Sequence, residues 1–231
     1  MTQSFTGQPM YENGSLNQAT GGPLRPGGQD LTERMLTLCE LSPGDMVLDV
    51  GCGTGSTVRY LLDVLSVYPI GVDRSELLLQ TGLINDPRLP LVCAWGRSLP
   101  FTSGQIDTVL TECSLSAISN LDSMLAEIRR VLRPGGQLAI TDIYARNPDG
   151  IPTLRALPLR CGLRDAMTQN ALTTCLQSHG FEVVLWEDHS ETIKYLAGQI
   201  ILAHGSMNEF WSKSEPGTNL FDIQIAISKA K

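Results

Sequence analysis

Residues 47–56 read Val47-Leu48-Asp49-Val50-Gly51-Cys52-Gly53-Thr54-Gly55-Ser56. An apolar run ends at the aspartate, and three glycines follow at alternate positions. Apolar residues then recur at helical spacing, at Val58, Leu61, Leu62 and Leu65. This order predicts a strand, a tight turn and a helix, the start of a βαβ unit. Because glycine lacks a Cβ and accepts positive φ, a ligand can lie against the turn and face the first N–H groups of the helix.

The spacing of the glycines separates two kinds of ligand. Dinucleotide sites carry G-x-G-x-x-G, whereas here Ser56 stands where the third glycine would be. With Asp49 two residues ahead of the turn, the stretch resembles motif I of the class I S-adenosylmethionine (SAM) dependent methyltransferases. The resemblance implies that SAM is bound by Asp49, Gly51, Cys52, Gly53, Thr54 and Gly55. Another Rossmann-like nucleotide site, such as that of a nicotinamide oxidoreductase, is the alternative.

The composition narrows the class of protein. With 231 residues, 42% of them hydrophobic, the chain is long enough for one α/β domain with a full core. No apolar run approaches the ~18 residues that a membrane span requires, and residues 1–28 lack an export signal. We therefore expect a cytoplasmic protein without membrane contact. A net charge of −7 without a Lys/Arg cluster argues against nucleic acid and favours a small-molecule acceptor.

Beyond the glycine turn, hydrophobic periodicity alternates between strand and helix. Strands are expected at 46–50, 69–72, 89–93, 106–111, 137–142, 181–187 and 221–228. Helices are expected from an N-cap at Asp30, over about 56–67, after Asp73, over about 121–132 and 168–178, and from 190 onward. The order matches the Rossmann-like α/β sheet of methyltransferases, which implies seven strands, helices on both faces and an antiparallel last strand.

We expect three parts along the chain. The Gly-rich residues 1–29 form an N-terminal arm or partial lid, and residues 30–231 form the methyltransferase domain. Within that domain, an insert at about 144–167 follows the fifth strand, where this fold often places substrate determinants. Arg129-Arg130-Val131-Leu132-Arg133-Pro134-Gly135-Gly136 resembles the family's R-x-L-x-P-G-G, in which Pro and Gly end the helix and turn the chain before that strand.

Asp73 is the second cofactor candidate. It ends the second expected strand about 20 residues after the glycine turn, where an acidic side chain can hydrogen-bond ribose hydroxyls. The alternative is a charge at a helix N-terminus, because Asp73-Arg74-Ser75-Glu76 also begins a helix. Arg74 and Glu112, the latter at the end of the fourth strand, are further residues that the resemblance assigns to the SAM site.

The loop after the third strand departs from the family pattern. Ala94-Trp95-Gly96-Arg97-Ser98-Leu99-Pro100-Phe101 ends like the loop of the small-molecule methyltransferases that include the quinone-biosynthesis enzymes. In that family an Asp four residues before the Leu faces the adenine amino group, and here Trp95 occupies the position. Adenine recognition is then left to the backbone near Gly96, Arg97 and Ser98, or to stacking on Trp95.

The methyl acceptor is the open question. A hydroxyl or carbon nucleophile needs a base, but surface or core positions are the favoured interpretation of His179, His189 and His204. A soft, thiol-bound acceptor needs none. The acceptor side resembles arsenite methyltransferases, which hold trivalent arsenic between a Cys after strand 4 and a Cys in the later insert. The resemblance implies Cys113 and Cys161 as acceptor-binding thiolates, with no resident metal.

Several alternatives remain at this point. This chain lacks the further N-terminal cysteine and the longer C-terminal extension of arsenite methyltransferases, so a small organic acceptor such as a quinone-like C or O nucleophile is the main alternative. A non-catalytic SAM-binding regulator is another. The six cysteines are scattered without a CxxC pair, which predicts reduced thiols, and Cys52 in particular is expected to be a packing residue.

Overall fold

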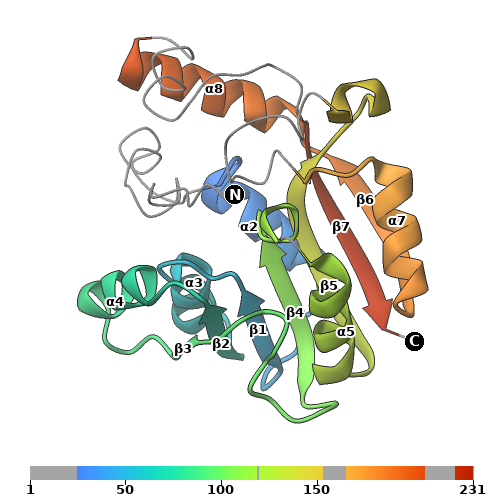
Figure 1. Cartoon of the computed structure of the whole chain (residues 1–231). Coiled ribbons are helices and arrows are strands. Elements are labelled where there is room, and N and C mark those ends of the chain that lie inside the picture. Colours follow the sequence, from blue (N-terminus) through green and yellow to red (C-terminus); the bar gives the residue numbers. More distant parts are fainter. Residues whose placement is uncertain (1–24, 119, 153–164, 206–221, 231) are drawn as a thin grey trace, which may run out of the picture.

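A computed structural model describes residues 25–118, 120–152, 165–205 and 222–230 (Figure 1). Its centre is one seven-stranded sheet with the order β3-β2-β1-β4-β5-β7-β6. The strands are β1 (Met46–Val50), β2 (Tyr68–Asp73), β3 (Leu91–Cys93), β4 (Ile106–Glu112), β5 (Leu132–Tyr144), β6 (Phe181–Asp188) and β7 (Asp222–Ala230). Strands β1 to β5 pair in parallel, and β7 is antiparallel to both β5 and β6. The predicted fold class, including the antiparallel last strand, is confirmed.

Helices cover both faces of the sheet (Figure 1). The helices are α2 (Gly28–Leu38), α3 (Ser56–Val64), α4 (Glu76–Asn85), α5 (Leu121–Val131), α7 (Gln169–Ser178) and α8 (Glu191–His204), with short 3-10 turns η1 (Leu115–Ala117) and η2 (Pro148–Gly150). None of these helices is both long and apolar enough to cross a membrane.

Strand β1 shows why helices cover both faces of the sheet. Successive side chains of a strand point to opposite faces, and here Leu48 and Val50 join the buried cluster with residues of α5 and α7. Val47 points to the opposite face and belongs to the buried cluster formed with residues of α2 and α3. A strand that is buried on both faces reads as a nearly continuous apolar run, and β1 does so except at Asp49. The sheet therefore holds the glycine turn at the end of a rigid central strand.

Element boundaries differ from the prediction in a few places. Helix α2 has its N-cap at Gly27, so Asp30 lies in the first turn instead of capping the helix. Helix α3 ends at Val64 because Leu65 is already extended. The predicted turn at 133–136 lies within β5 as a bulge, since the register shifts between the pairs Ile106–Leu132 and Thr108–Gln137.

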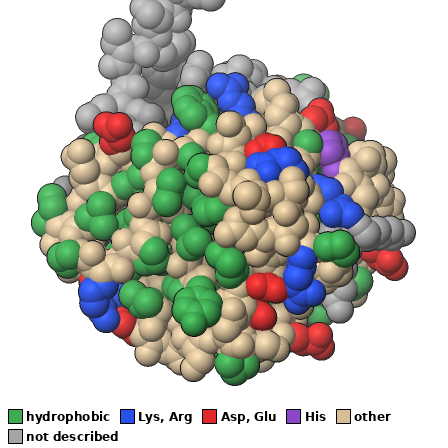
Figure 2. Space-filling model, turned by 90° about the horizontal axis from the view of Figure 1, so that it is seen from below, with side chains coloured by type: hydrophobic (Ala, Val, Ile, Leu, Met, Phe, Trp, Pro, Cys, Tyr) green, Lys and Arg blue, Asp and Glu red, His purple; other side chains and the backbone are tan. Residues whose placement is uncertain are grey.

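The amino ends of the strands form the face opposite the carboxyl edge of the sheet. Figure 2 shows this face from below, with hydrophobic side chains gathered on one part of it and charged side chains of both signs around them. Val64 at the end of α3 and Tyr68 at the start of β2 are 58% and 67% exposed. The buried carboxylates described next lie at the other, carboxyl edge, where open α/β sheets bind their ligands.

Candidate cofactor site and acceptor side

The glycine turn adopts a backbone that side chains would disturb. Gly51, Gly53 and Gly55 have φ values of 86°, 56° and 79°. A Cβ on Gly51 would lie 2.0 Å from Ser114 Oγ, because the end of β1 and the residues after β4 approach closely there. Gly55 is also the N-cap of α3. The turn thus brings the start of α3 and the end of β4 to one place, as motif I predicts.

Asp73 joins the turn to the next helix. Its Oδ2 accepts a hydrogen bond from the Gly53 N–H at 2.9 Å, and its Oδ1 accepts one from the Ser75 N–H at 2.8 Å. Ser75 is the N-cap of α4, so the helix-terminus interpretation of Asp73 is confirmed. The carboxylate also faces the glycine turn, as a ribose-binding residue would. Its contact with ribose stays a prediction.

Three carboxylates converge at the ends of β1, β2 and β4. Asp49 is 2% exposed, and burial together with the charges of Glu112 and Asp73 raises its pKa well above the usual range, with partial relief from Arg25. Carboxylates that share a desolvated space favour the arrival of a positive charge. SAM carries a sulfonium and an ammonium group, so this acidic cradle fits that cofactor.

Glu112 is bound within the protein by partners that the sequence did not reveal. The Arg25 Nε lies 2.7 Å from its Oε2, which also accepts a hydrogen bond from Thr32 Oγ1 at 2.7 Å. Its Oε1 accepts a hydrogen bond from Thr57 Oγ1 at 2.5 Å. Arg25 also donates to Ser56 and Thr57 at the start of α3. The predicted direct role of Glu112 in SAM binding remains untested, but its observed role is to position these elements.

None of these partners followed from the sequence motifs. Thr57 follows the glycine turn in the sequence, and this position was the one sequence signal for any of the partners of Glu112. Arg25 and Thr32 precede β1 in a stretch whose pattern says nothing of a contact with the end of β4.

Trp95 lies at the expected adenine end and is 51% exposed. The guanidinium carbons of Arg97 and Arg74 lie 4.7 and 5.4 Å from its ring centroid, distances typical of cation–π contacts. Ser98 donates its N–H to the Trp95 carbonyl at 2.8 Å. A Cβ on Gly96 would lie 3.1 Å from Val50 Cγ1, so the loop packs against the end of β1. The structure therefore brings Arg74, Gly96, Arg97 and Ser98 together around Trp95.

Cys113 lies at the rim beside this site in a rare backbone conformation. Its φ is 51°, and its N–H donates to the Thr141 carbonyl at 2.7 Å. Burial of the sulfur and the nearby Asp142 raise the thiol pKa well above its usual range. A thiol in this setting is protonated until a metalloid binds, so binding there would have to displace a proton from a desolvated sulfur beside a carboxylate. Cys161 lies outside the described residues, so the predicted cysteine pair is not seen together.

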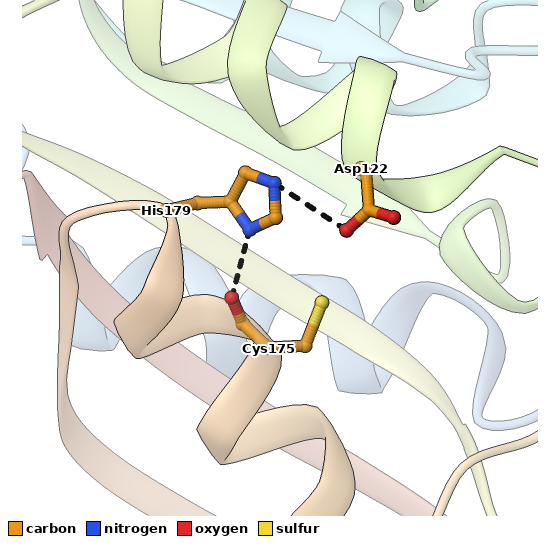
Figure 3. A group of neighbouring side chains, drawn as sticks. All are labelled: Asp122, Cys175 and His179. Atoms are coloured by element: carbon orange, nitrogen blue, oxygen red, sulfur yellow. Dashed lines mark hydrogen bonds and ion pairs between the residues drawn. The ribbon is translucent and has the colours of Figure 1, made fainter.

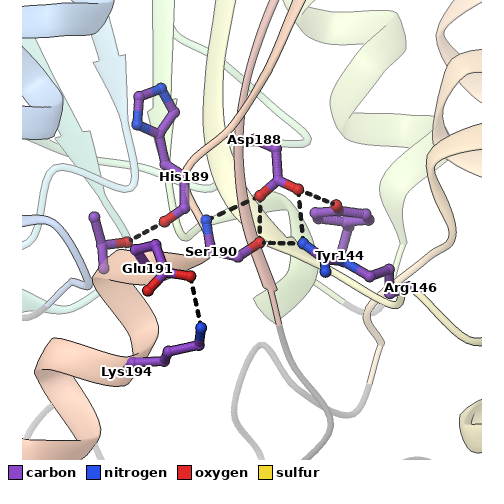
Figure 4. Close-up of polar contacts among 8 residues, drawn as sticks. Tyr144, Arg146, Asp188, His189, Ser190, Glu191 and Lys194 are labelled. Carbon is purple, nitrogen blue, oxygen red and sulfur yellow. Dashed lines mark hydrogen bonds and ion pairs between the residues drawn. The ribbon is translucent and has the colours of Figure 1, made fainter.

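A polar hub stands at the carboxyl ends of β5 and β6 (Figure 4). Asp188 accepts hydrogen bonds from Tyr144 at 3.2 Å, from Arg146 at 2.7 Å and from the Ser190 N–H at 2.9 Å. A cavity of about 330 Å³ adjoins the hub. It is lined by Tyr144, Ala145, Arg146, Pro148, Thr168, Gln169 and Asn170. This cavity lies on the predicted acceptor side of the fold.

The histidines with described side chains occupy the structural positions expected of them. His189 lies 2.9 Å from Glu187 Oε2, and His179 bonds to the Cys175 carbonyl at the end of α7. The side chain of His204 lies outside the described residues. The thiols of Cys39, Cys52, Cys93, Cys113 and Cys175 are all free, as predicted. Cys39 and Cys52 are buried, which confirms that Cys52 is a packing residue.

Comparison with known proteins agrees with this geometry. Residues 48–140 match the methyltransferase domain family. A demethylmenaquinone methyltransferase from Corynebacterium urealyticum is 30% identical over 200 residues, which are 77% of this chain and 83% of that protein. The chain therefore belongs to the class I SAM-dependent methyltransferases. The nicotinamide oxidoreductase alternative is wrong.

Other relatives share less of their length. The uncharacterized methyltransferase YodH of Bacillus subtilis is 37% identical over 128 residues, and this chain spans 54% of that protein. Among solved structures, the [4+2]-cyclase SpnF aligns with a TM-score of 0.77 at 24% identity, over 96% of this chain and 93% of that one. At this identity the likeness shows the fold alone, and one fold hosts many reactions.

Proposed function

We propose that this chain transfers the methyl group of SAM to a small organic acceptor that reacts in its ionised form, as a phenolate- or enolate-type oxygen or carbon nucleophile whose proton has left to solvent before the transfer. The observation that carries the proposal is the convergence of Asp49, Asp73 and Glu112 on a glycine turn at the carboxyl edge of the sheet. SAM supplies an electrophilic methyl group on a cationic sulfur. The chain holds that cofactor, lines up the acceptor and excludes water.

Different side chains contact different parts of the cofactor. The Asp49 carboxyl, which holds a proton in the fold without cofactor, can release that proton to face the cationic cofactor. The Asp73 carboxylate offers oxygens to the ribose hydroxyls, and these oxygens also accept hydrogen bonds from the Gly53 and Ser75 N–H groups. The exposed ring of Trp95 offers a flat surface for adenine in place of the usual aspartate. Arg25, through Glu112, ties the segment before α2 to the same edge. Residues 1–24 of the predicted N-terminal arm or partial lid lie outside the described residues.

Two observations favour an organic acceptor over thiol-bound arsenite. Burial and the nearby Asp142 oppose the thiolate form of Cys113, so a metalloid at the rim would have to displace its proton at a cost. The cavity beside Tyr144 and Arg146 instead offers an aromatic ring with hydrogen-bonding groups at its edge. Since the relative from C. urealyticum is named for a quinone-type substrate and aligns over most of its length, a quinol-like ring is the first acceptor class to test.

The test has a binding arm and a turnover arm. Calorimetry with SAM and with its demethylated product should show saturable binding that Asp73→Asn weakens. Asp63→Asn is the matched control, because Asp63 lies on the exposed side of α3 in an ion pair with Arg88. Absence of SAM binding by the wild-type chain would overturn the cofactor assignment.

Turnover is measured with demethylated quinols and phenols beside arsenite with thiol. Methylation of an organic acceptor that survives Cys113→Ser and Cys161→Ser supports the proposal. Methylation of arsenite that either substitution abolishes would return the acceptor to the cysteine pair. SAM binding without turnover across the panel would indicate a SAM-binding protein that does not catalyse transfer to these acceptors.

A further inference from the structure

Three different metal-binding side chains meet between α5 and α7, away from the glycine turn (Figure 3). Asp122 lies in the first turn of α5, and Cys175 and His179 lie at the end of α7. One oxygen, one nitrogen and one sulfur from these residues all lie within 4.8 Å of one another. Cys175 and His179 are four residues apart, a spacing that places side chains on one side of a helix.

The tautomer of His179 leaves a ligand atom facing this space. Its Nδ1 lies 2.9 Å from the Cys175 carbonyl, which can accept a hydrogen bond but cannot donate one. Nδ1 also lies 3.2 Å from Ser178 Oγ, but that hydroxyl donates its own proton to the Cys175 carbonyl. We therefore assign the proton to Nδ1, so that in the neutral ring Nε2 carries a lone pair. Nε2 lies 3.5 Å from Asp122 Oδ1, so a lone pair and a carboxylate face each other. A metal ion between them would therefore be coordinated by both atoms.

We propose that Asp122, Cys175 and His179 bind a divalent transition-metal ion of the zinc type. Zinc takes sulfur, imidazole nitrogen and carboxylate oxygen in tetrahedral sites. Ligand atoms at ~2.0–2.3 Å from zinc stand roughly 3.3–3.8 Å apart, which small side-chain adjustments reach from the observed positions. The hydrogen bond from Nδ1 to a carbonyl is the outer contact that orients metal-bound histidines. Water completes the fourth position.

The sulfur is what separates a metal site from a plain ion pair. The Cys175 sulfur lies within 4.8 Å of both the Asp122 oxygen and the His179 nitrogen, where a third ligand of one ion would lie. A metal ion displaces the thiol proton to solvent and neutralises the thiolate and carboxylate together. A protonated His179 would satisfy Asp122 alone and would give the sulfur no role. Binding also has an open route, because the Asp122 side chain is 82% exposed.

The position suggests what the ion does. Helix α5 begins shortly after η1, the turn that follows Cys113 at the acceptor rim, and α7 leads into β6 with its hub residue Asp188. Buried residues of both helices, such as Met124 and Leu176, belong to one cluster on the same face of the sheet. The ion ties the outer ends of two helices that flank the acceptor side. The ion stabilises the packing of α5 against α7 and lies apart from the methyl-transfer site.

The test uses the full chain after chelation, titrated with Zn²⁺ alone and with Co²⁺ as a spectroscopic substitute. We expect one equivalent of Zn²⁺ to bind, and a sulfur-to-cobalt charge-transfer band to appear. Cys175→Ser should abolish that band, and Asp122→Asn should weaken Zn²⁺ binding by more than about tenfold, as loss of a metal contact does. Cys93→Ser is the matched control, since Cys93 is an exposed thiol on β3.

Zn²⁺ should also raise the unfolding midpoint of the wild type, because a ligand that binds only the folded state stabilises it. Asp122→Asn changes an exposed side chain and should fold, so it still tests the metal site if Cys175→Ser or His179→Gln fails to fold. Absence of stoichiometric Zn²⁺ binding, or a cobalt band that persists in Cys175→Ser, would overturn the proposal. A band that disappears in Cys93→Ser instead would place the metal elsewhere.

Discussion

The guanidinium of Arg25 lies 2.7 Å from the carboxylate of Glu112, and their side chains are only 12% and 4% exposed. This buried ion pair joins the residues before α2 to the end of β4. Thr32 from α2 and Thr57 from α3 complete the hydrogen bonds of the carboxylate. The relative position of three elements around the SAM site therefore depends on one charge pair.

Removing Arg25 should destabilise the fold and the cofactor site together. Arg25→Ala leaves Glu112 buried beside Asp49 without its counter-charge, and breaking a buried pair from one side costs about 3–5 kcal/mol. We expect a loss of that order in the free energy of unfolding, measured by urea denaturation. Affinity for SAM, measured by calorimetry, should fall as well, because the start of α3 loses its anchor.

Two comparisons isolate the pair. Arg59→Ala removes a half-exposed arginine that lies 3.5 Å from Asp86, and surface pairs of this kind contribute at most about 1 kcal/mol. The double variant Arg25→Ala/Glu112→Gln removes both charges and should recover part of the lost stability. Equal losses for Arg25→Ala and Arg59→Ala would contradict the role given to the buried pair.

Gly51 should tolerate no side chain. In Gly51→Ala the new Cβ would meet Ser114 Oγ at 2.0 Å and Ser114 Cβ at 2.7 Å, at a φ of +86°. We expect loss of SAM binding by calorimetry and a lower unfolding midpoint. Gly44→Ala, in the turn before β1, is the matched control, because its Cβ has open space at a φ of +90° and bears only the strain of a positive φ, roughly 1–2 kcal/mol. Ser114→Gly should partly rescue Gly51→Ala, and a failure to do so would point to φ as the whole cause.

The sequence predicted the sheet well because its signals are local. The apolar run at 47–50 and the glycines after it specify a strand, turn and helix without help from the rest of the chain, and β1 has the predicted bounds. Periodicity also placed β4 and β6 to within a residue. Predictions were less accurate where an end depends on tertiary contacts, as at Gly27, which caps α2, and at the bulge that places 133–136 inside β5.

The candidate site was predictable only in part, for the same reason. Motif I and Asp73 are sequence motifs, so their convergence could be foreseen. Arg25 and Thr32 reach Glu112 across the fold, and no spacing in the chain encodes that contact. The raised pKa of Cys113 likewise comes from burial and from Asp142 on the neighbouring strand, and so the thiolate prediction could not be weighed before the structure was known.

Trp95 provides a test of adenine recognition. Trp95→Ala removes the flat surface that Arg74 and Arg97 flank, and a lost aromatic contact of about 0.5–1.5 kcal/mol corresponds to a few-fold to tenfold weaker SAM binding. Trp95→Phe should retain most of the affinity. Leu77→Ala, another exposed hydrophobic change near the start of α4, controls for surface effects. If Trp95→Ala binds SAM like the wild type, backbone groups of the loop recognise adenine instead.

The Asp49 carboxyl should lower the stability of the fold as pH rises and strengthen cofactor binding. Its pKa in the fold is raised by burial and by Glu112 and Asp73, so the folded state holds a proton that the unfolded chain releases. Stability from this group is present below the ordinary aspartate pKa of about 3.9 and is lost as pH rises through the folded-state pKa. Asp49→Asn removes the titration, so the variant should gain stability over the wild type as pH rises. Urea unfolding between pH 5 and pH 8 measures that difference.

The same substitution should weaken SAM binding, because the Asp49 carboxyl can release its proton when the cationic cofactor binds, whereas an amide cannot become negative. A matched Asp63→Asn variant, on the exposed side of α3, should change neither property. Opposite signs for stability and affinity are the distinguishing result, since ordinary structural damage lowers both. A variant that loses stability at pH 8 and still binds SAM at full strength would show that the buried charge of Asp49 serves the fold and not the cofactor.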